Sequence, residues 1–445
     1  IDMMLIKIQK TVQKLSIFNK KTLHLKIISR YKNLKFMRKI LLTSLMFAFT
    51  GVVNAQLFVK DGSYVFMTNQ YMTVMQDVNL NNSGSFYLRN TSQLLQKGGA
   101  SVNSGTGKLS VFQEGTVNNF QYNYWCSPVG NGAAGNPFGV ALLNRPTGLI
   151  SSTPAEILPT NNPNGTATGG TAGNMQIAPY WIWRFVSLSP IYANWQYVGN
   201  AQTINPGEGF TMKGTSGTDA TAADAAEDNE LIAGVQAKAN NTGSAQRYDF
   251  RGRPNDGNIS VTVSSGNLTL VGNPYSSAIN LNMYLVEHTG RSYDSGGVIS
   301  AGGNPNIIDG SAYFWEHSKS GNSHVLNTYV GGYGTYVANG VNIATPGTWT
   351  AATWATYDGA GNQVSAGSST GSNFKRQFSP IGQGFMVKGV GAGGASTMKN
   401  KYRVFVREGV GNESTFEKTA NSNQTVNQQN WDEIPNVADI DYTQL

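Results

Sequence analysis

Side chains suited to chemistry are few in this chain, which has one cysteine and four histidines among 445 residues. Cys126 lies between Trp125 and Ser127 in an apolar stretch. A free cysteine in such a stretch usually packs as a small buried hydrophobe. A nucleophilic thiol needs a nearby base, and no histidine or asparagine pattern marks one for Cys126. The sequence therefore predicts a core cysteine rather than a catalytic one.

The histidines and carboxylates do not form a catalytic set either. His317 and His324 flank a Gly321-Asn322 turn, so a hairpin would bring the two imidazoles near each other. Two histidines alone make a weak metal site, because zinc takes four ligands. We expect surface histidines here, and we predict no metal-binding and no cofactor-binding residue anywhere in the chain.

One pair of carboxylates, Glu208 and Glu316, is a candidate for acid–base chemistry on a glycosidic bond, which needs two carboxyl groups at a set separation. An internal repeat, described below, argues against this pair. The position of Glu208 holds Gln383 in the other copy, and the position of Glu316 holds Arg184. We predict no catalytic residue, and a polysaccharide-active enzyme remains an alternative.

Tryptophans are the candidate ligand contacts, because their flat rings can stack on sugar rings. The candidates are Trp181, Trp183, Trp195, Trp349 and Trp354. Alternation in a strand would place Trp181 and Trp183 on one face. Trp183 recurs as Trp315 at the same landmark of the repeat, which favours core packing for that pair.

An octapeptide of pattern G-[E/Q]-G-F-x-[M/V]-K-G occurs twice and organises the chain. Its landmark residues are Gly207, Gly209, Phe210 and Gly214 in the first copy and Gly382, Gly384, Phe385 and Gly389 in the second. Two further landmarks precede it in the same order: 124–128 corresponds to 270–274, and 181–184 to 313–316. Three landmarks at shifts of 146, 132 and 175 residues predict a duplicated β unit with loops of different length.

Composition predicts the fold class. Glycine contributes 52 of 445 residues, aromatic residues 11% and charged residues 13%. These values, with few helix-forming runs, are typical of strands and turns. We predict an all-β chain with a short N-terminal β module, either a meander or solenoid-like rungs, followed by two related units of β-sandwich or jelly-roll type.

The start of the chain is typical of an export signal. Met37 begins a short basic segment, 40–53 is uncharged and mostly apolar, and a cut is expected between Ala55 and Gln56. This apolar run is shorter than the roughly 20 residues of a membrane span, so no membrane span is predicted. Residues 1–55 hold 11 of the 32 basic and one of the 25 acidic residues. The remainder carries 21 basic and 24 acidic residues, which argues against nucleic-acid binding.

The predicted segments follow from these landmarks. They are a non-structural extension (1–36), a signal peptide (37–55), an N-terminal β module (56–118), the first β unit (119–217), an Ala-rich acidic insertion or linker (218–246), the second β unit (247–410), and a linker with the start of a further domain (411–445). Asp256-Gly257 predicts a hairpin between the strands before and after it.

Several phrases carry a resemblance to a known group of proteins. They are Gly107–Gly115 running into Tyr122–Pro128, Tyr248–Gly257, Leu270–Ala278, and the pairing of Gln383-Gly384-Phe385 with Arg403-Val404-Phe405. The chain resembles large secreted surface proteins of Flavobacterium-like Bacteroidetes. The resemblance implies a location in the medium or on the outer surface of a Gram-negative bacterium. It also implies the type IX secretion machinery as a partner, through a C-terminal sorting domain that is not in this sequence.

The resulting expectation for function is a secreted cell-surface protein of adhesin or binding-module type, with glycans or other surface polymers as partners. Besides the enzyme named above, the alternatives are the carbohydrate-binding accessory region of such an enzyme and a structural stalk. The long loops of the two units would carry the contact surface.

Overall fold

The computed structural model describes residues 56–98, 103–217, 246–318, 322–365, 367, 369–371, 375–408, 414 and 416. These residues form strands joined by turns and short 3-10 helices, and the one α-helix among them is α2 (Leu281–Glu287). The all-β prediction is confirmed. No helix in this described part of the chain is long and apolar enough to cross a membrane. The predicted signal residues 37–55, the extension 1–36 and nearly all of 218–246 and 411–445 lie outside the described residues.

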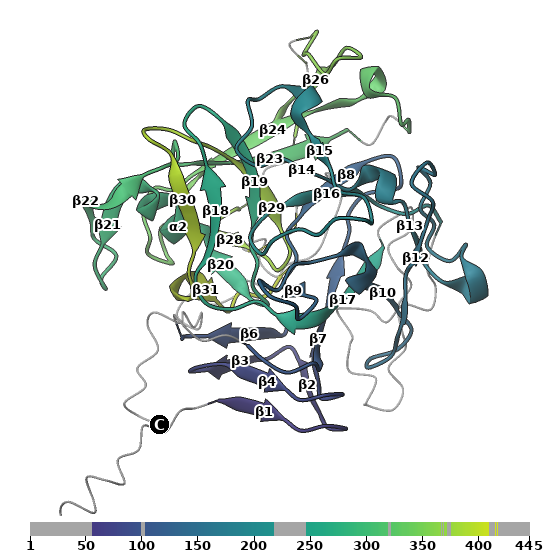
Figure 1. Cartoon of the computed structure of the whole chain (residues 1–445). Helices are drawn as coiled ribbons and strands as arrows, with labels where there is room; N and C mark the ends of the chain where they lie inside the picture. The colour runs from purple at the N-terminus through teal and green to yellow at the C-terminus, as the bar shows by residue number, and fades with distance from the viewer. Residues whose placement is uncertain are drawn as a thin grey trace, which may run out of the picture. The chain divides into compact units, whose positions relative to one another are not determined.

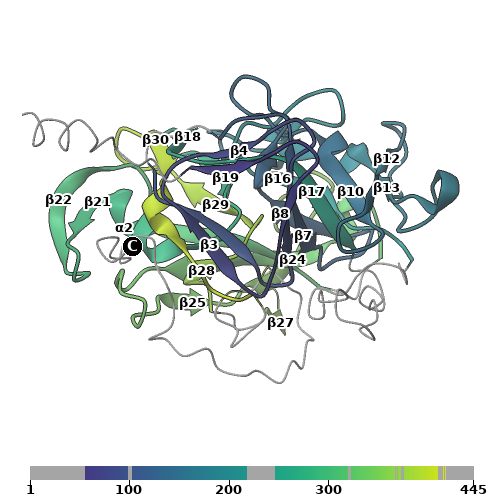
Figure 2. The same cartoon turned by 90° about the horizontal axis from the view of Figure 1, so that it is seen from below.

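The N-terminal module is a parallel β-solenoid, which confirms the solenoid alternative over the meander. Its strands are β1 (Leu57–Val59), β2 (Tyr64–Thr68), β3 (Tyr71–Val74), β4 (Val78–Leu80), β5 (Ser85–Arg89), β6 (Gln93–Gln96) and β7 (Lys108–Glu114). Strand β1 pairs with β4, β2 with β5, and β3 with β6, all parallel. Figure 1 shows β1, β4, β3 and β6 stacked one above another, and Figure 2 views this coil from below.

Asparagines make the corners of this coil. Asn69 and Asn90 occupy equivalent corners of successive rungs, with φ of 56° and 53°. Their side chains are hydrogen-bonded to each other. Asparagine tolerates the left-handed conformation better than most residues, so each corner turns without a glycine.

The solenoid continues into the first unit, which consists of two facing sheets. Strand β5 pairs parallel with β7, and β7 pairs antiparallel with β17 (Arg247–Pro254). The other strands of this sheet are β9 (Val129–Gly130), β10 (Leu143–Pro146) and β11 (Ser152–Pro154). The facing sheet has the order β15-β14-β16-β8. Its strands are β8 (Tyr122–Trp125), β14 (Trp183–Arg184), β15 (Gln196–Tyr197) and β16 (Phe210–Lys213).

Large aromatic residues fill the space between these two sheets. Trp125 of β8 packs on Tyr248 and Phe250 of β17, with ring centroids 5.4 and 5.6 Å apart. Phe210 of β16 stacks on Phe138 at 5.2 Å. Each such ring buries roughly 150–250 Å², so this cluster dominates the first core.

The second unit is built around a sheet of order β19-β29-β23-β24-β26-β27. Its strands are β19 (Leu268–Gly272), β23 (Ser311–His317), β24 (Val330–Val337), β25 (Thr348–Thr350), β26 (Thr353–Thr356), β27 (Ser369–Thr370) and β29 (Gly384–Lys388). Strands β18 (Ile259–Val263), β20 (Ala278–Asn280), β21 (Thr289–Tyr293), β22 (Ile299–Asn306), β28 (Phe378–Ser379), β30 (Gly394–Met398) and β31 (Arg403–Val404) form smaller sheets around it. Helix α2 is buried along its whole length in this core, and the Asn280 side chain caps it by accepting a hydrogen bond from the Asn282 N–H.

The two octapeptide strands have matching surroundings. In the first unit Phe210 lies opposite Trp125, and in the second Phe385 lies opposite Val271. The repeat predicts these partners, because a shift of 175 residues relates Phe210 to Phe385 and a shift of 146 residues relates Trp125 to Val271. Both phenylalanines are fully buried. The third landmark is offset by two residues, because Trp183 lies opposite Thr211 whereas Tyr313, not Trp315, lies opposite Met386.

The two units meet through reciprocal contacts between these same strands. Glu208 forms an antiparallel bridge with Val271, and Gln383 forms one with Trp125. Gly272 touches Cys126 at this junction: a Cβ added to Gly272 would lie 2.4 Å from the Cys126 Cβ and 2.5 Å from the Gln383 carbonyl oxygen. A glycine at 272 is therefore what lets the two backbones approach.

Strand β17 is the main departure from the predicted chain order. It lies inside the range 247–410 assigned to the second unit, yet it pairs with β7, β9 and β10 of the first. The hairpin predicted at Asp256-Gly257 is wrong, because β18 pairs with β30 instead. Asp256 forms a buried ion pair with Arg403, 3.3 Å away, and accepts hydrogen bonds from Gln96 and Asn400. This polar contact ties the solenoid to the second unit.

Candidate functional site: an aromatic cavity at the junction

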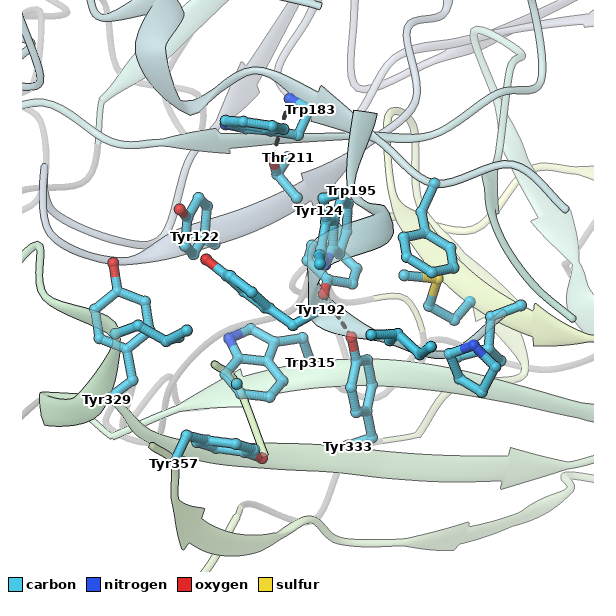
Figure 3. A pocket seen from close by; sticks show the side chains of 18 residues that line it. Tyr122, Tyr124, Trp183, Tyr192, Trp195, Thr211, Trp315, Tyr329, Tyr333 and Tyr357 are labelled. Atoms are coloured by element: carbon cyan, nitrogen blue, oxygen red, sulfur yellow. Dashed lines mark hydrogen bonds between the residues drawn. The ribbon is translucent and has the colours of Figure 1, made fainter. Parts of the chain in front are cut away.

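A cavity of about 360 Å³ opens where the two units meet (Figure 3). Ligand pockets in proteins typically span roughly 300–1,000 Å³ and are mainly apolar and aromatic. The 18 lining residues include ten aromatic ones and no charged one. They are Tyr122, Tyr124, Trp183, Phe185, Pro190, Ile191, Tyr192, Ala193, Trp195, Thr211, Leu268, Trp315, Leu326, Tyr329, Tyr333, Tyr357, Gly361 and Met386.

Strand alternation explains which side chains reach the cavity. On β8, Tyr122 and Tyr124 face the cavity, whereas Trp125 turns into the first core. The corresponding face of β19 supplies Leu268. The central strands contribute Thr211 of β16 and Met386 of β29, which occupy the same position of the repeated octapeptide. Residues at matching positions of the two units therefore line the same cavity.

Hydrogen bonds and ring contacts join the two walls. The hydroxyls of Tyr124 and Tyr333, which come from different units, are 2.6 Å apart (Figure 3). Trp315 packs edge-on against Tyr333 with centroids 5.2 Å apart, and Tyr124 packs edge-on against Trp195 at 5.9 Å. Burial, followed by the neighbouring Tyr333, raises the pKa of Tyr124 well above its usual range. Its hydroxyl is therefore a neutral hydrogen-bonding group.

One buried polar group of the lining is left for a ligand. The Trp315 indole nitrogen is buried and has no hydrogen-bond partner within the described residues. Figure 3 shows the Trp315 ring between the side chains of Tyr192 and Tyr357. An unsatisfied buried donor costs about 1–3 kcal/mol, which a ligand acceptor would recover.

The loop that carries Tyr192 covers part of the cavity. Tyr192 belongs to the 3-10 helix η4 (Tyr192–Asn194) and is 46% exposed. It lies directly on Gly361 of the second unit, where an added Cβ would come within 2.4 Å of the Tyr192 Cβ. Exposed Ile191 and Tyr333 extend the apolar surface at the rim.

One wall of the cavity covers a buried lysine. Lys213 ends β16, is 4% exposed, and its Nζ lies 3.5 Å from the centre of the Trp181 ring and 4.7 Å from that of Tyr122. The ammonium donates a hydrogen bond to the hydroxyl of Tyr329, which lines the cavity. Burial lowers the pKa of Lys213 to about 6.

The five predicted contact tryptophans fall into different places. Trp183 and Trp195 line the cavity, whereas Trp181 is buried against Lys213. Trp349 packs edge-on against Phe314 of the second core, and Trp354 lies on β26 away from the lining. Trp183 and Trp315, for which we expected core packing, are both partly buried and line the cavity, and Trp315 also packs against the core cluster that contains Leu270 and Met386.

Sequence reasoning missed the tyrosines that make up most of the aromatic lining. The available signal was the polar–aromatic alternation of 120–125, which fits a strand with one buried face and does not by itself indicate a cavity. Tyr192, Tyr329 and Tyr357 lie beside short loops and carry no such pattern. Only the packing of one unit on the other brings these residues together.

The other residues considered for chemistry have structural surroundings. Burial raises the pKa of the Cys126 thiol far above its usual range, as expected for a core cysteine. Glu208 accepts a hydrogen bond from Asn205 of its own turn and forms an ion pair with Arg184 of β14, and Glu316 is buried on β23; neither lines the cavity. Within the described ranges no group of three His, Cys, Asp or Glu side chains has a metal-binding arrangement.

The two histidines of the expected hairpin both approach Lys213. The His324 Nδ1 is 3.2 Å from the Lys213 Nζ, and the His317 ring lies 5.0 Å from that of Tyr329. His317 is 3% exposed, so the expectation of a surface residue is wrong for it. Burial, and then the charge of Lys213, lowers the pKa of both histidines to about 4.

Fold and site together define an all-β protein of two joined units with an aromatic cavity between them. Residues 159–437 match the family described as "Domain of unknown function (DUF8693)", and the chain belongs to that family. The matched stretch contains all the cavity-lining residues except Tyr122 and Tyr124. No curated protein and no solved structure matches the chain.

Proposed function

We propose that this protein is a secreted cell-surface binding module that holds a sugar ring of a glycan in the aromatic cavity. The observation that carries the proposal is the lining itself, in which ten of 18 residues are aromatic and none is charged. The axial C–H groups of a sugar present a weakly positive face, and the faces of aromatic rings are negative. Tyrosine hydroxyls and the Trp315 N–H would form hydrogen bonds with the sugar hydroxyls.

Binding without hydrolysis is favoured over catalysis. A glycosidase needs two carboxyl groups on either side of the scissile bond. The lining contains neither Asp nor Glu, and the one candidate pair, Glu208 and Glu316, lies elsewhere. The proposal therefore assigns recognition to the cavity and no chemical step.

Secretion and an origin by internal duplication are further parts of the proposal. The matching partners of Phe210 and Phe385 support duplication. The signal-like segment 37–55 and the resemblance to type IX-exported surface proteins support a location outside the cell. In this proposal the ligand site forms only where the two copies of the duplicated unit meet.

The test is glycan binding by the full chain and by two single variants. A glycan array identifies a ligand, and isothermal titration measures its affinity for the wild type, Trp315→Ala and Trp349→Ala. Trp315 lines the cavity, whereas Trp349 packs elsewhere in the same sheet and is the matched control. We expect Trp315→Ala to lose about tenfold or more in affinity and Trp349→Ala to bind normally, since one stacking ring contributes about 0.5–1.5 kcal/mol and the indole N–H adds a hydrogen bond. No glycan on the array, or equal loss in both variants, would overturn the proposal.

A further inference from the structure

We infer that the sugar ring bound in the cavity carries a negatively charged group, a carboxylate or a sulfate ester, with Lys213 as its counter-ion. This inference rests on the proposed function and narrows its ligand class to acidic glycans. It starts from Lys213, a cationic side chain that lies behind the cavity wall formed by Tyr122 and Tyr329.

Lys213 lies in an enclosure built from both units. Trp181 and Tyr122 of the first unit face its ammonium, and Tyr329 and His324 of the second accept its hydrogen bonds. His324 is itself fixed, because its Nε2 is 2.9 Å from the Asn164 side-chain oxygen. That oxygen also accepts a hydrogen bond from the Asn119 amide, so the His324 Nε2 carries the proton and the Nδ1 accepts from Lys213.

The enclosure lacks the partner that a buried ammonium normally has. Among the described residues no carboxylate contacts Lys213; its ammonium faces aromatic rings, the Tyr329 hydroxyl and the His324 imidazole. Burying a cation without an anion is costly, which is why the pKa of Lys213 falls to about 6. An anionic ligand would supply the missing charge.

The second unit has a lysine at the same position, and its setting differs. Lys388 ends β29 as Lys213 ends β16, but its side chain is exposed to solvent. The octapeptide thus does not require a buried lysine. What is particular to Lys213 is the enclosure, which lies on the cavity side of the first unit.

Tyr329 connects this charge to the cavity. Its hydroxyl accepts a hydrogen bond from Lys213, so its own proton is available to donate onward. Tyr329 lines the cavity beside Tyr122, as Figure 3 shows. A hydroxyl polarised by an ammonium is a stronger donor to an anionic oxygen than an ordinary tyrosine. The ligand anion therefore has a direct donor and a nearby compensating charge.

The titratable groups around Lys213 do not compete with it as the counter-ion of the ligand near neutral pH. They are Tyr122 on β8, His317 on β23, His324, and Tyr329 before β24. The pKa of each histidine is lowered to about 4, and burial raises the pKa values of the two tyrosines. Between about pH 5.5 and 8, Lys213 is thus the one member of this group that changes charge.

The experiment compares matched oligosaccharides that differ only in charge. Oligouronates with free carboxylates, the same chains as methyl esters, and sulfated and unsulfated forms of one neutral oligosaccharide are titrated against the full-length wild type, Lys213→Met and Lys388→Met. We expect the wild type and Lys388→Met to prefer an acidic form about tenfold or more over its neutral partner, because a charge-assisted hydrogen bond replaces an ordinary one. Lys213→Met should lose this preference while retaining binding of the neutral form. The carboxylate and sulfate arms identify which anion the site takes.

The pH dependence of wild-type binding gives a test that needs no variant. The acidic ligand binds the protonated lysine, so its affinity should be constant below about pH 6 and fall by up to tenfold per unit above it. The methyl ester should show no such fall. Equal binding of neutral and acidic forms at all pH values would overturn this inference and leave the proposed function standing. Absence of binding by every form would overturn both.

Discussion

Substitution of Gly272 by alanine tests the junction on which the cavity depends. The added Cβ would lie 2.4 Å from the Cys126 Cβ, 2.5 Å from the Gln383 carbonyl oxygen and 2.9 Å from the Gly384 Cα. Non-bonded carbon atoms prefer separations of about 3.5–4.0 Å, so the two units must move apart by about 1 Å. None of these atoms is the end of a flexible side chain, and relaxation is therefore costly.

We expect this substitution to destabilise the protein by about 3 kcal/mol, the upper part of the range of about 1–3 kcal/mol for overpacking. The assay is urea denaturation of the full chain followed by tryptophan fluorescence. Gly359→Ala is the control, because Gly359 has no heavy atom within 4 Å of an added Cβ and no positive φ. It should change the stability by less than about 0.5 kcal/mol.

A double variant separates this clash from other effects at position 272. Removing the Cys126 Cβ in Gly272→Ala/Cys126→Gly relieves the shortest of the contacts. The two substitutions should therefore be non-additive, with the double variant more stable than the sum of the single effects. The reasoning is refuted if Gly272→Ala is as stable as Gly359→Ala, since the units would then not be pressed together at this point.

Two further predictions concern buried charges. Arg403→Met should lower the free energy of unfolding by about 3–5 kcal/mol, because it removes the ion-pair partner of the buried Asp256 carboxylate. Adding Asp256→Asn should recover part of this stability. Equal stabilities of the single and double variants would contradict the prediction. Glu287 accepts hydrogen bonds from Lys399, Lys401 and Tyr402, and these outweigh the effect of burial and lower its pKa to about 2. Because the pKa of Glu287 is lower in the folded state, the stability that Glu287 contributes is present above about pH 4.5 and is lost as the pH falls toward 2. The total loss is about 3 kcal/mol. The free energy of unfolding, measured as a function of pH, should show this loss in the wild type and a flatter profile in Glu287→Gln.

Local patterns predicted the elements of the fold but not their partners. The short apolar pieces of 57–112, bounded by Asn and Gly, indicated either a meander or solenoid-like rungs, because both are built from short strands with local turns. The octapeptides indicated two strands, and their glycines mark the points where backbones touch. Strand β17 is different, since nothing in its own residues says that it pairs with β7, more than 130 positions earlier in the chain.

The site was predictable only in part, for the same reason. Trp183 and Trp195 were among the candidates, but the repeat suggested that Trp183 and Trp315 pack in equivalent cores. The offset of two residues at this landmark, set by the register of β23 on β29, instead brings Trp315 to the cavity. Lys213 and Lys388 occupy the same position of the repeated octapeptide but have different surroundings, which only the packing of the opposite unit decides.

The most direct test of the central claim is ¹⁹F NMR of the protein labelled with 5-fluorotryptophan, recorded while a bound glycan is titrated. Trp183, Trp195 and Trp315 line the cavity, whereas Trp125, Trp349 and Trp354 lie outside its lining. Single Trp→Phe variants assign the signals. A sugar ring held between the two units predicts shifts at the first three tryptophans and unchanged signals for the other three. Shifts confined to Trp349 or Trp354, with the cavity tryptophans unmoved, would contradict the account.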